Sequence, residues 1–257
     1  MSYSSLRVPI DCVSGADVLT RILSWRRRGT AGYITCVNPH SVMTCRRDHA
    51  FHTAIAESDL AVPDGVGITI AARLLHERRL PRVAGPSMML HVCDAGRPHG
   101  LRHFFYGGGA GVADVVAERL SRQFPSLQVA GTMSPPFRPL NPDEEANIVE
   151  EINRSRPDIV WVALGTGKQE KWMREHSSRL QATALVGVGA AFDFHAGVTP
   201  WAPAWVRHAG LEWAYRLLHE PRRLWRRNLD SPVFLARILG QSMLATKSPL
   251  IYFRNAH

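Results

Sequence analysis

The stretch Asp158-Ile-Val-Trp-Val-Ala-Leu-Gly-Thr-Gly-Lys-Gln-Glu170 places an unbroken apolar run directly before a glycine-rich turn. Apolar residues in succession, rather than in alternation, are typical of a strand that is covered on both faces in a parallel sheet. Gly165 and Gly167 end this strand, and a helix is expected from about Gln169. This unit of strand, turn and helix predicts an α/β protein.

The same alternation of strand and helix continues over about two hundred residues. Further strands are expected at 33–37, 59–62, 102–106 and 184–188, and helices at 14–25, 38–56, 66–75, 112–123 and 141–154. Ser14 and Asp17 are spaced as a capping box at the start of the first helix. In a chain of 257 residues this order indicates one core with a Rossmann-like, mostly parallel sheet flanked by helices.

Residues 205–257 differ from the rest in charge. They contain nine basic residues and three acidic ones, so they hold most of the formal net charge of +9. Arginine far outnumbers lysine, and leucine and tryptophan are interleaved with it. We expect a short helical, amphipathic appendage after a core of residues 1–204. Such a segment suits an anionic membrane surface or a diphosphate-bearing ligand, whereas a nucleic-acid binder would more often spread its basic residues over one face.

Several classes of protein are not supported by the sequence. It has no run of about 18 to 20 apolar residues that would span a bilayer, and no basic region followed by an apolar stretch near residue 1. The cysteines are not spaced as metal ligands and are expected to be reduced; they are Cys12, Cys36, Cys45 and Cys93. We therefore expect no metal, no cofactor and a cytoplasmic protein that at most lies on the membrane.

Three loops follow predicted strands and would meet at one edge of the sheet, where folds of this type bind ligands. The first is Gly107–Gly111, which precedes a predicted helix. Backbone amides of Gly107 and Gly108 at a helix N-terminus would suit phosphate. The loop lacks the Lys-Ser/Thr ending of a P-loop. A tight turn between strand and helix would also require glycine, so the loop is either a phosphate contact or a purely structural turn.

The second loop contains Asp64, in the turn Pro63-Asp64-Gly65. A carboxylate at a strand end suits a general base, although Asp-Gly is also a common turn sequence. Thr35 and Asn38 lie at the end of a neighbouring predicted strand, and would either converge on the same crevice or cap a helix.

The third loop runs from Gly165 to Glu170. Gln169 suits the amide edge of a nucleobase, and Lys168 or the loop amides suit phosphate; the alternative is a capped helix start with a solvated Lys168. His195 lies among aromatic residues and is expected to be a packed, hydrogen-bonded histidine rather than a base.

Taken together, these loops and several motifs further along fall in the order and spacing of one family. The motifs are Thr35–Pro39, Pro63–Gly65, Gly165–Glu170, Gly187–Gly189, Phe192–Gly197, Ala202-Pro203, Glu212–Arg216 and Glu220–Arg226. The chain resembles the WecG/TagA/CpsF glycosyltransferases, glycosyltransferase family 26, from about residue 6 to residue 240.

The resemblance implies a metal-independent, inverting transferase on the cytoplasmic face of the plasma membrane. Such enzymes move a sugar from a UDP-sugar to an undecaprenyl-diphosphate-linked saccharide in cell-surface or exopolysaccharide biosynthesis. Matched position by position, the general base falls on Asp64, with Thr35 and Asn38 in the same pocket. Family members form homo-oligomers, so a homo-oligomer is one expected assembly, and nucleic acid is not an expected partner.

The resemblance also assigns the UDP-sugar side of the site. The uridine-side glutamine falls on Gln169, and the arginines that close over the diphosphate fall on Arg216, Arg223 and Arg226. Gly85-Pro86-Ser87 replaces the common Gly-x-Asp, which leaves N-acetylmannosamine, mannosaminuronate and glucose open as donor sugars. Two other functions remain as alternatives: a catalytically silent, membrane-recruited protein that binds a nucleotide sugar, and a Rossmann-type oxidoreductase, whose dinucleotide fingerprint is not convincing here.

Overall fold

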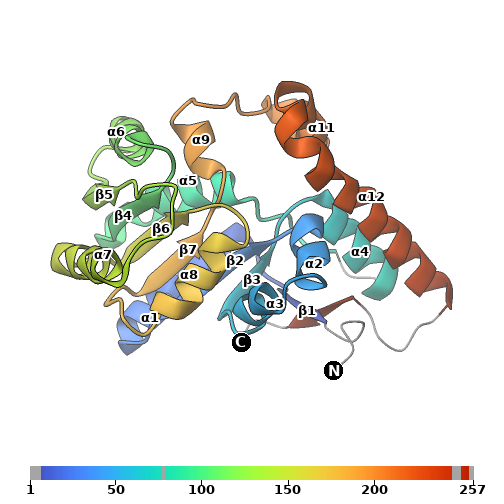
Figure 1. The fold of residues 1–257 in the computed structure, drawn as a ribbon, viewed down its shortest axis with the longest axis horizontal. Coiled ribbons are helices and arrows are strands. Elements are labelled where there is room, and N and C mark those ends of the chain that lie inside the picture. Colours follow the sequence, from blue (N-terminus) through green and yellow to red (C-terminus); the bar gives the residue numbers. More distant parts are fainter. Residues whose placement is uncertain (1–6, 77–78, 245–249, 255–257) are drawn as a thin grey trace.

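The centre of the molecule is a six-stranded parallel sheet in the order β3-β2-β7-β6-β4-β5 (Figure 1). The computed structural model describes residues 7–76, 79–244 and 250–254. The strands are β2 (Gly32–Val37), β3 (Leu60–Pro63), β4 (Arg102–Gly107), β5 (Gln128–Met133), β6 (Ile159–Ala163) and β7 (Ala184–Gly187). Every residue of β6 is buried, which explains its unbroken apolar sequence.

Helices cover both faces of this sheet. They are α1 (Gly15–Arg28), α2 (Pro39–Cys45), α3 (His49–Ala56), α4 (Val66–His76), α5 (Gly85–Ala95), α6 (Val112–Gln123), α7 (Pro142–Ser155), α8 (Lys168–His176) and α9 (Ala191–His195), with a 3-10 turn η2 (Arg97–His99). One core cluster joins α1, α5, α6 and α9 to one face, and another joins α7 and α8 to the opposite face. The α/β architecture with a parallel sheet is therefore confirmed.

The structure differs from the expected elements in a few places. The single helix expected up to residue 56 is two helices: α2 ends at Cys45, and Asp48 caps α3 by accepting a hydrogen bond from the Phe51 amide at 3.0 Å. The sequence did not predict α5, which is largely buried, or β5, an edge strand whose residues are exposed or half buried. The capping box of Ser14 and Asp17 at the start of α1 is confirmed.

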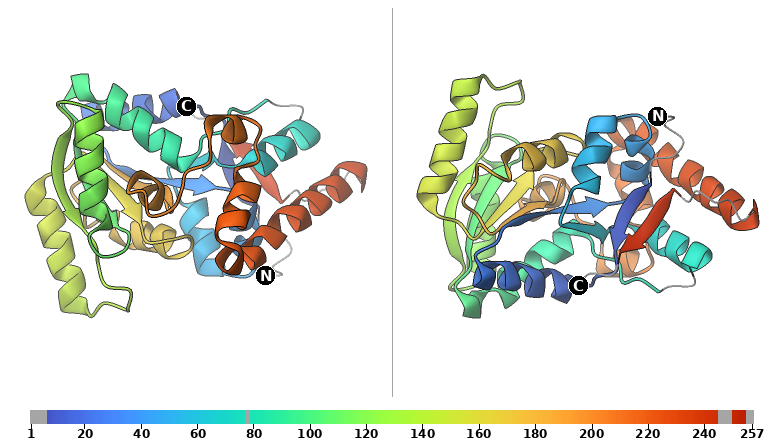
Figure 2. Two further views of the ribbon diagram at one scale, coloured as in Figure 1. Left: turned by 90° about the horizontal axis from the view of Figure 1, so that it is seen from above. Right: turned by 90° about the horizontal axis from the view of Figure 1, so that it is seen from below.

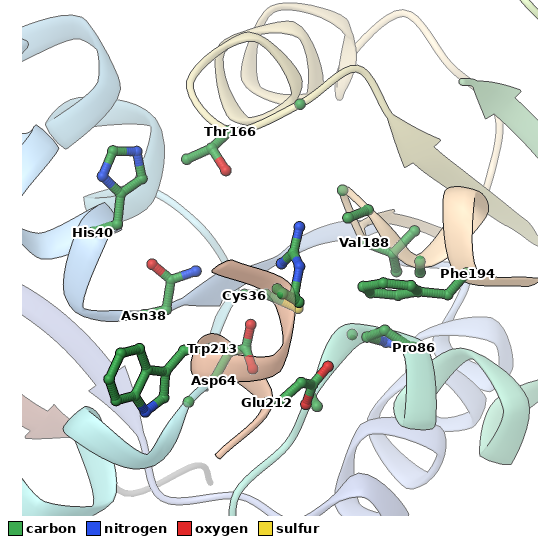
Figure 3. A pocket seen from close by; sticks show the side chains of 18 of the residues that line it. Cys36, Asn38, His40, Asp64, Pro86, Thr166, Val188, Phe194, Glu212 and Trp213 are labelled. Carbon is green, nitrogen blue, oxygen red and sulfur yellow. The ribbon is translucent and has the colours of Figure 1, made fainter. Parts of the chain in front are cut away.

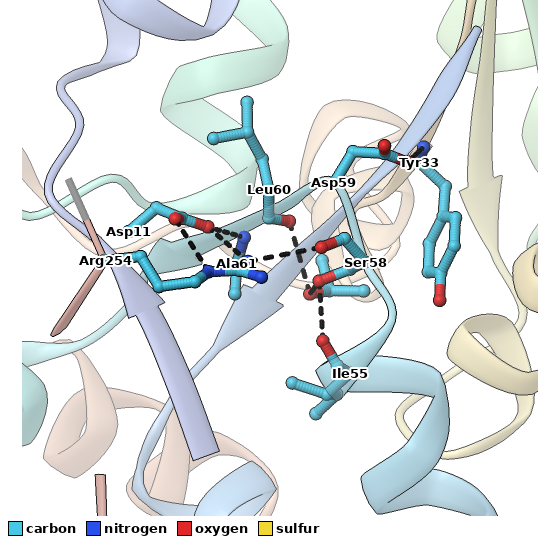
Figure 4. Close-up of polar contacts among 9 residues, drawn as sticks. Asp11, Tyr33, Ile55, Ser58, Asp59, Leu60, Ala61 and Arg254 are labelled. Atoms are coloured by element: carbon cyan, nitrogen blue, oxygen red, sulfur yellow. Dashed lines mark hydrogen bonds and ion pairs between the residues drawn. The ribbon is translucent and has the colours of Figure 1, made fainter. Parts of the chain in front are cut away.

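A second, two-stranded sheet joins the two ends of the described chain. Strand β1 (Val8–Asp11) pairs in parallel with β8 (Ile251–Arg254), and Figure 2 shows the two strands side by side. The buried carboxylate of Asp11 accepts a hydrogen bond from the Ala61 amide of β3 at 2.6 Å (Figure 4). The same carboxylate receives two hydrogen bonds from the Arg254 guanidinium, at 2.9 and 2.6 Å. Both strands are thereby tied to the edge of the main sheet.

The C-terminal helices are α10 (Ala204–His208), α11 (Glu212–His219) and α12 (Pro221–Leu244). Phe234 and Ile238 of α12 are fully buried in a cluster with residues of α2, α3 and α4. Asp230 of α12 accepts hydrogen bonds from Arg47 and pairs with His40, at 2.8 and 2.7 Å. The described residues of the C-terminal segment are thus packed onto the core through α12 and β8. No helix within the described residues is both long and apolar enough to cross a membrane.

His103 of β4 is a fully buried histidine between the sheet and α5. Its Nδ1 accepts a hydrogen bond from Trp161 Nε1 at 3.0 Å, and the two rings are stacked. Burial lowers the pKa of His103 to about 4 from its ordinary value of 6.5. The imidazole is therefore neutral in the folded protein at pH values where the unfolded chain would protonate it.

We predict that His103→Gln reduces the loss of stability on acidification. The unfolded state binds more protons than the folded state between pH 6.5 and about 4, so His103 lowers stability as pH falls through that window. At pH 5 this amounts to about 2 kcal/mol relative to pH 7.5. Glutamine keeps an acceptor for Trp161 without titrating. Urea unfolding at both pH values measures the difference.

The matched control is His99→Gln, since His99 is exposed on η2. This variant should lose as much stability on acidification as the wild type does. The buried His176 and His195 also have lowered pKa values, so part of the dependence should persist in His103→Gln. Equal losses in wild type and His103→Gln would show that His103 does not contribute.

Candidate active site

A cavity of about 990 Å³ opens at the carboxyl ends of the central strands. Its walls come from the loops after β2, β3, β4, β6 and β7, and from the helices α11 and α12. Because all strands of the sheet run in one direction, their carboxyl ends gather side chains that are distant in sequence. The predicted site residues that line it are Asn38, Asp64, Gly108, Gly165, Gln169 and Arg216.

Asp64 and Asn38 lie next to each other in this cavity (Figure 3). The Asp64 amide donates to the Val37 carbonyl at 2.8 Å, which fixes the turn after β3 against the end of β2. The Asn38 side-chain oxygen accepts from the Ser41 amide at 3.0 Å and so caps α2. Asn38 therefore caps a helix and also faces the cavity, where its amide nitrogen is the group it presents to a ligand.

Cys36 lies beneath these residues at the end of β2. Burial raises the pKa of its thiol well above the ordinary value, and the nearby carboxylates of Asp64 and Glu170 raise it further. The thiol is therefore protonated and unsuited to act as a nucleophile. Its surroundings show that Asp64 and Glu170 both place negative charge at this end of the cavity.

Thr35 lies outside the lining of the cavity, in contrast to its expected position. Side chains alternate along a strand, so Thr35 points to the face of the sheet opposite that of Cys36. It is fully buried, and its hydroxyl group lies 3.2 Å from Ser58 Oγ and 3.4 Å from the Leu60 carbonyl. The structure therefore gives Thr35 contacts within the sheet and the α3–β3 loop.

The glycine-rich loop after β4 contains a tight turn, in which the Gly108 amide donates a hydrogen bond to the Ala163 carbonyl at 2.9 Å. Gly107 has φ +118°, and a Cβ there would lie 2.5 Å from the Ala163 carbonyl oxygen, so the tight turn itself requires glycine. Gly107 does not line the cavity, whereas Gly108 and Gly109 do. They precede α6, which has no side-chain cap within the described residues, so amides at its first turn suit an anion.

Gln169 connects two of the loops. Its side-chain oxygen accepts from the Gly189 amide at 3.1 Å, and its nitrogen donates to Glu170 at 3.0 Å. Glu170 in turn accepts from the Gly167 amide at 2.7 Å. Gln169 is 3% exposed and lines the cavity, and its bond to Glu170 uses one of the two N–H groups of the side-chain amide. Lys168, predicted as a possible phosphate ligand, is exposed and lies outside the cavity lining, which fits the alternative of a solvated residue at a helix start.

Arg216 of α11 brings positive charge to the cavity. Its guanidinium carbon lies 5.1 Å from the centre of the Phe194 ring. Its Nε is buried and has no hydrogen-bond partner among the described residues. A half-buried arginine whose Nε has no described partner favours an anionic ligand such as phosphate. The side chains of Arg223 and Arg226, both in α12, lie outside the part of the structure that is described.

Two further lining residues were not predicted as site residues. Arg82, in the segment between α4 and α5, forms an ion pair with Glu212 at the start of α11. Arg82 is the last of several basic residues that lie close together in the sequence. From the sequence alone, such residues are most simply expected to lie on a solvated surface. Glu212 belongs to a family motif, but nothing in its sequence assigned it a role.

His195 is packed, as predicted. It is 9% exposed, its Nε2 donates to the Pro86 carbonyl at 3.2 Å, and its ring meets that of Trp201 edge to face. Burial lowers its pKa below the ordinary value. Across residues 7–76, 79–244 and 250–254, no three histidine, cysteine or acidic side chains are grouped as a metal site.

A parallel sheet whose strand ends carry a carboxylate and a glycine-rich turn, with an arginine of α11 lining the same cavity, is typical of an α/β protein that binds its ligand at the carboxyl edge. Sequence comparison identifies the enzyme class further. The model of the Glycosyl transferase WecG/TagA/CpsF family matches residues 3–248. The chain therefore belongs to this family, and it is a glycosyltransferase.

Curated relatives of the chain include proteins of Bacillus and Staphylococcus species. Similar proteins of Bacillus subtilis and Bacillus spizizenii are 29% and 28% identical over 208 and 215 residues. The alignments cover 81% and 84% of this chain, and 79% and 81% of the relatives. A Staphylococcus aureus relative is 26% identical over 80% of this chain and 79% of its own length. All three are named N-acetylglucosaminyldiphosphoundecaprenol N-acetyl-beta-D-mannosaminyltransferase.

Proposed function

We propose that this glycosyltransferase moves a sugar from a UDP-sugar to a saccharide carried on a polyprenyl diphosphate, with inversion at the anomeric carbon and without a metal ion. The observation that carries the proposal is that the Asp64 carboxylate and the Arg216 guanidinium line one cavity. The names of the relatives supply the acceptor class and, by analogy, a place in cell-surface polysaccharide biosynthesis.

Asp64 is the general base of the proposed reaction. It takes the proton of the acceptor hydroxyl while that oxygen attacks the anomeric carbon and the bond from this carbon to the UDP oxygen breaks. Attack from the face opposite UDP inverts the configuration. The turn that carries Asp64 is held by the hydrogen bond to the Val37 carbonyl, so the carboxylate is presented from a rigid part of the sheet. Asn38, which lies beside Asp64, would contact either the acceptor or the donor sugar.

Negative charge grows on the departing diphosphate, and other residues of the cavity offer positive partners for it. These are the amides of the Gly108 loop at the start of α6 and the Arg216 guanidinium. Groups fixed before the reaction stabilise such charge better than mobile water does. We assign Gly165 and the remaining N–H group of Gln169 to the binding of uridine. Arg223 and Arg226 are assigned to the diphosphate as further ligands.

The donor sugar is proposed from the relatives, which transfer an N-acetyl-beta-D-mannosaminyl group. UDP-N-acetylmannosamine is therefore the first donor to test, beside UDP-glucose and the mannosaminuronate donor. A catalytically silent binding protein would bind these donors without transferring their sugar.

The C-terminal helices provide a surface for peripheral attachment to an anionic membrane. Trp205, Trp213 and Leu218 are 70%, 53% and 80% exposed, and Arg222 and Arg237 are exposed on α12. Exposed tryptophan and leucine beside arginine are typical of helices that lie in a lipid interface. Trp213 also lines the cavity, so the site would open where the lipid part of the acceptor remains in the bilayer.

We predict that Asp64→Asn lowers transfer to a lipid-diphosphate-linked N-acetylglucosamine acceptor about a hundredfold or more, as is typical for loss of a general base. Affinity for UDP should change little, because Asp64 acts on the acceptor hydroxyl. Radiolabelled sugar transfer and titration calorimetry with UDP measure the two effects. Asp143→Asn, at an exposed position of α7, is the control. Turnover by Asp64→Asn close to that of the wild type would remove Asp64 from this role.

A second prediction concerns membrane binding. Trp205→Ser combined with Leu218→Ser should weaken cosedimentation with vesicles of phosphatidylglycerol and phosphatidylcholine at least severalfold, because the apolar contacts with lipid are lost. Neither residue lines the cavity, so transfer to a water-soluble acceptor analogue should persist.

Val115→Ser combined with Val129→Ser is the matched control, since these residues are exposed on α6 and β5. Vesicle binding equal to that of the wild type in the Trp205 and Leu218 variant would place the membrane surface elsewhere. Removal of residues after Ala204 is a poor test, because it would also remove the buried Phe234 and Ile238 and the strand β8.

A further inference from the structure

Helix α11 lies over the cavity without an apolar anchor of its own. None of its side chains is buried, and an isolated helix of eight residues is not stable in water. It packs against α12, and specific contacts at its ends add to what holds it in position. Two acidic side chains make such contacts, Glu212 in the first turn and Glu220 directly after the last residue.

Glu212 is bound to the core through Arg82. The two side chains form an ion pair and are only 12% and 23% exposed, so water screens their attraction less than it does in a surface pair. Arg82 also donates a hydrogen bond to the Arg207 carbonyl of α10 at 3.2 Å. One arginine of the α4–α5 segment thus holds both α10 and the start of α11.

Two other contacts restrain the ends of the helix. Gly210, just before α11, has φ +73°, and a Cβ there would lie 2.4 Å from the Val66 side chain of α4. The backbone therefore approaches α4 closely. After the helix, the Thr199 hydroxyl donates to the Glu220 carboxylate at 3.1 Å. Both ends of α11 are fixed to parts of the chain that belong to the core.

Glu212 and Arg216 are four residues apart and so lie on the same face of α11. Both line the cavity that contains Asp64, and Figure 3 shows the side chains of Asp64 and Glu212 among those that line it. Fixing Glu212 therefore fixes where the Arg216 guanidinium lies relative to the rest of the cavity. Glu212 itself is occupied by Arg82, whereas Asp64 follows β3 and belongs to the rigid edge of the sheet.

We propose that Glu212 is a positioning residue: paired with Arg82, it holds α11 so that Arg216 meets the diphosphate of the bound nucleotide. This inference rests on the proposed function, because it assumes that the cavity binds a UDP-sugar. It assigns Glu212 no proton transfer, although Glu212 is a carboxylate close to the proposed base.

The test is a double-mutant cycle on UDP affinity, measured by titration calorimetry for the wild type, Glu212→Gln, Arg216→Ala and the double variant. Glu212→Gln should weaken UDP binding about tenfold, and Arg216→Ala at least as much, as expected for loss of a charged hydrogen-bonding group. The double variant should bind no more weakly than Arg216→Ala alone, because Glu212 acts through Arg216.

Two variants make the result specific to the pair. Arg82→Gln removes the same ion pair from the other side, so it should lower UDP affinity to a similar extent and add nothing to Glu212→Gln. This variant also serves if Glu212→Gln does not fold. Glu118→Gln is the control: Glu118 pairs with Arg122 on the exposed surface of α6, and its loss should leave UDP affinity unchanged.

Unchanged UDP affinity in Glu212→Gln, or losses that add in the double variant, would overturn the inference and leave the proposed function intact. Loss of sugar transfer with full UDP affinity in Glu212→Gln would also overturn it, since that result would make Glu212 a base. A wild type that does not bind UDP would overturn the proposed function, and the inference with it.

Discussion

The parallel direction of the six central strands is the constraint on which the site depends. Because β2, β3, β4, β6 and β7 all end at one edge, their loops meet there although they are far apart in sequence. Two hydrogen bonds then connect neighbouring loops: the Asp64 amide to the Val37 carbonyl, and the Gly189 amide to the Gln169 side chain. The carboxylate and the glycine-rich turn are consequently presented from a sheet that is buried on both faces.

The C-terminal segment completes the cavity from outside the sheet. Helix α12 is integrated into the core through Phe234, Ile238 and the buried Asp230, whereas α11 relies on polar contacts at its ends. This division suits an enzyme whose acceptor is anchored in a lipid layer. The well-packed part keeps the segment attached, and the lightly packed helix carries Arg216 and exposes Trp213 and Leu218.

The sequence predicted the strands and helices with strong apolar runs, and it placed Asp64, Asn38 and Gln169 at the correct edge of the sheet. The sequence could not show that Thr35 points away from the cavity. Thr35 is assigned to the site because it belongs to a family motif, whereas the alternation of side chains along β2 determines the face to which it points. Strand β5 has a weak signal because it is a half-exposed edge strand. Two pairings join residues that are distant in sequence, that of β1 with β8 and that of Arg82 with Glu212. The basic residues around Arg82 give no indication in the sequence that Arg82 has an acidic partner.

The central claim is that UDP binds at the strand ends beneath α11. Amide hydrogen exchange with and without UDP tests it most directly. We expect slower amide exchange in Gly108–Val112 and in Glu212–His219 when UDP is bound. The exchange rates of α7, on the far side of the sheet, should not change. UDP that binds with protection confined to other segments, and with α11 exchanging as fast as in its absence, would contradict the account.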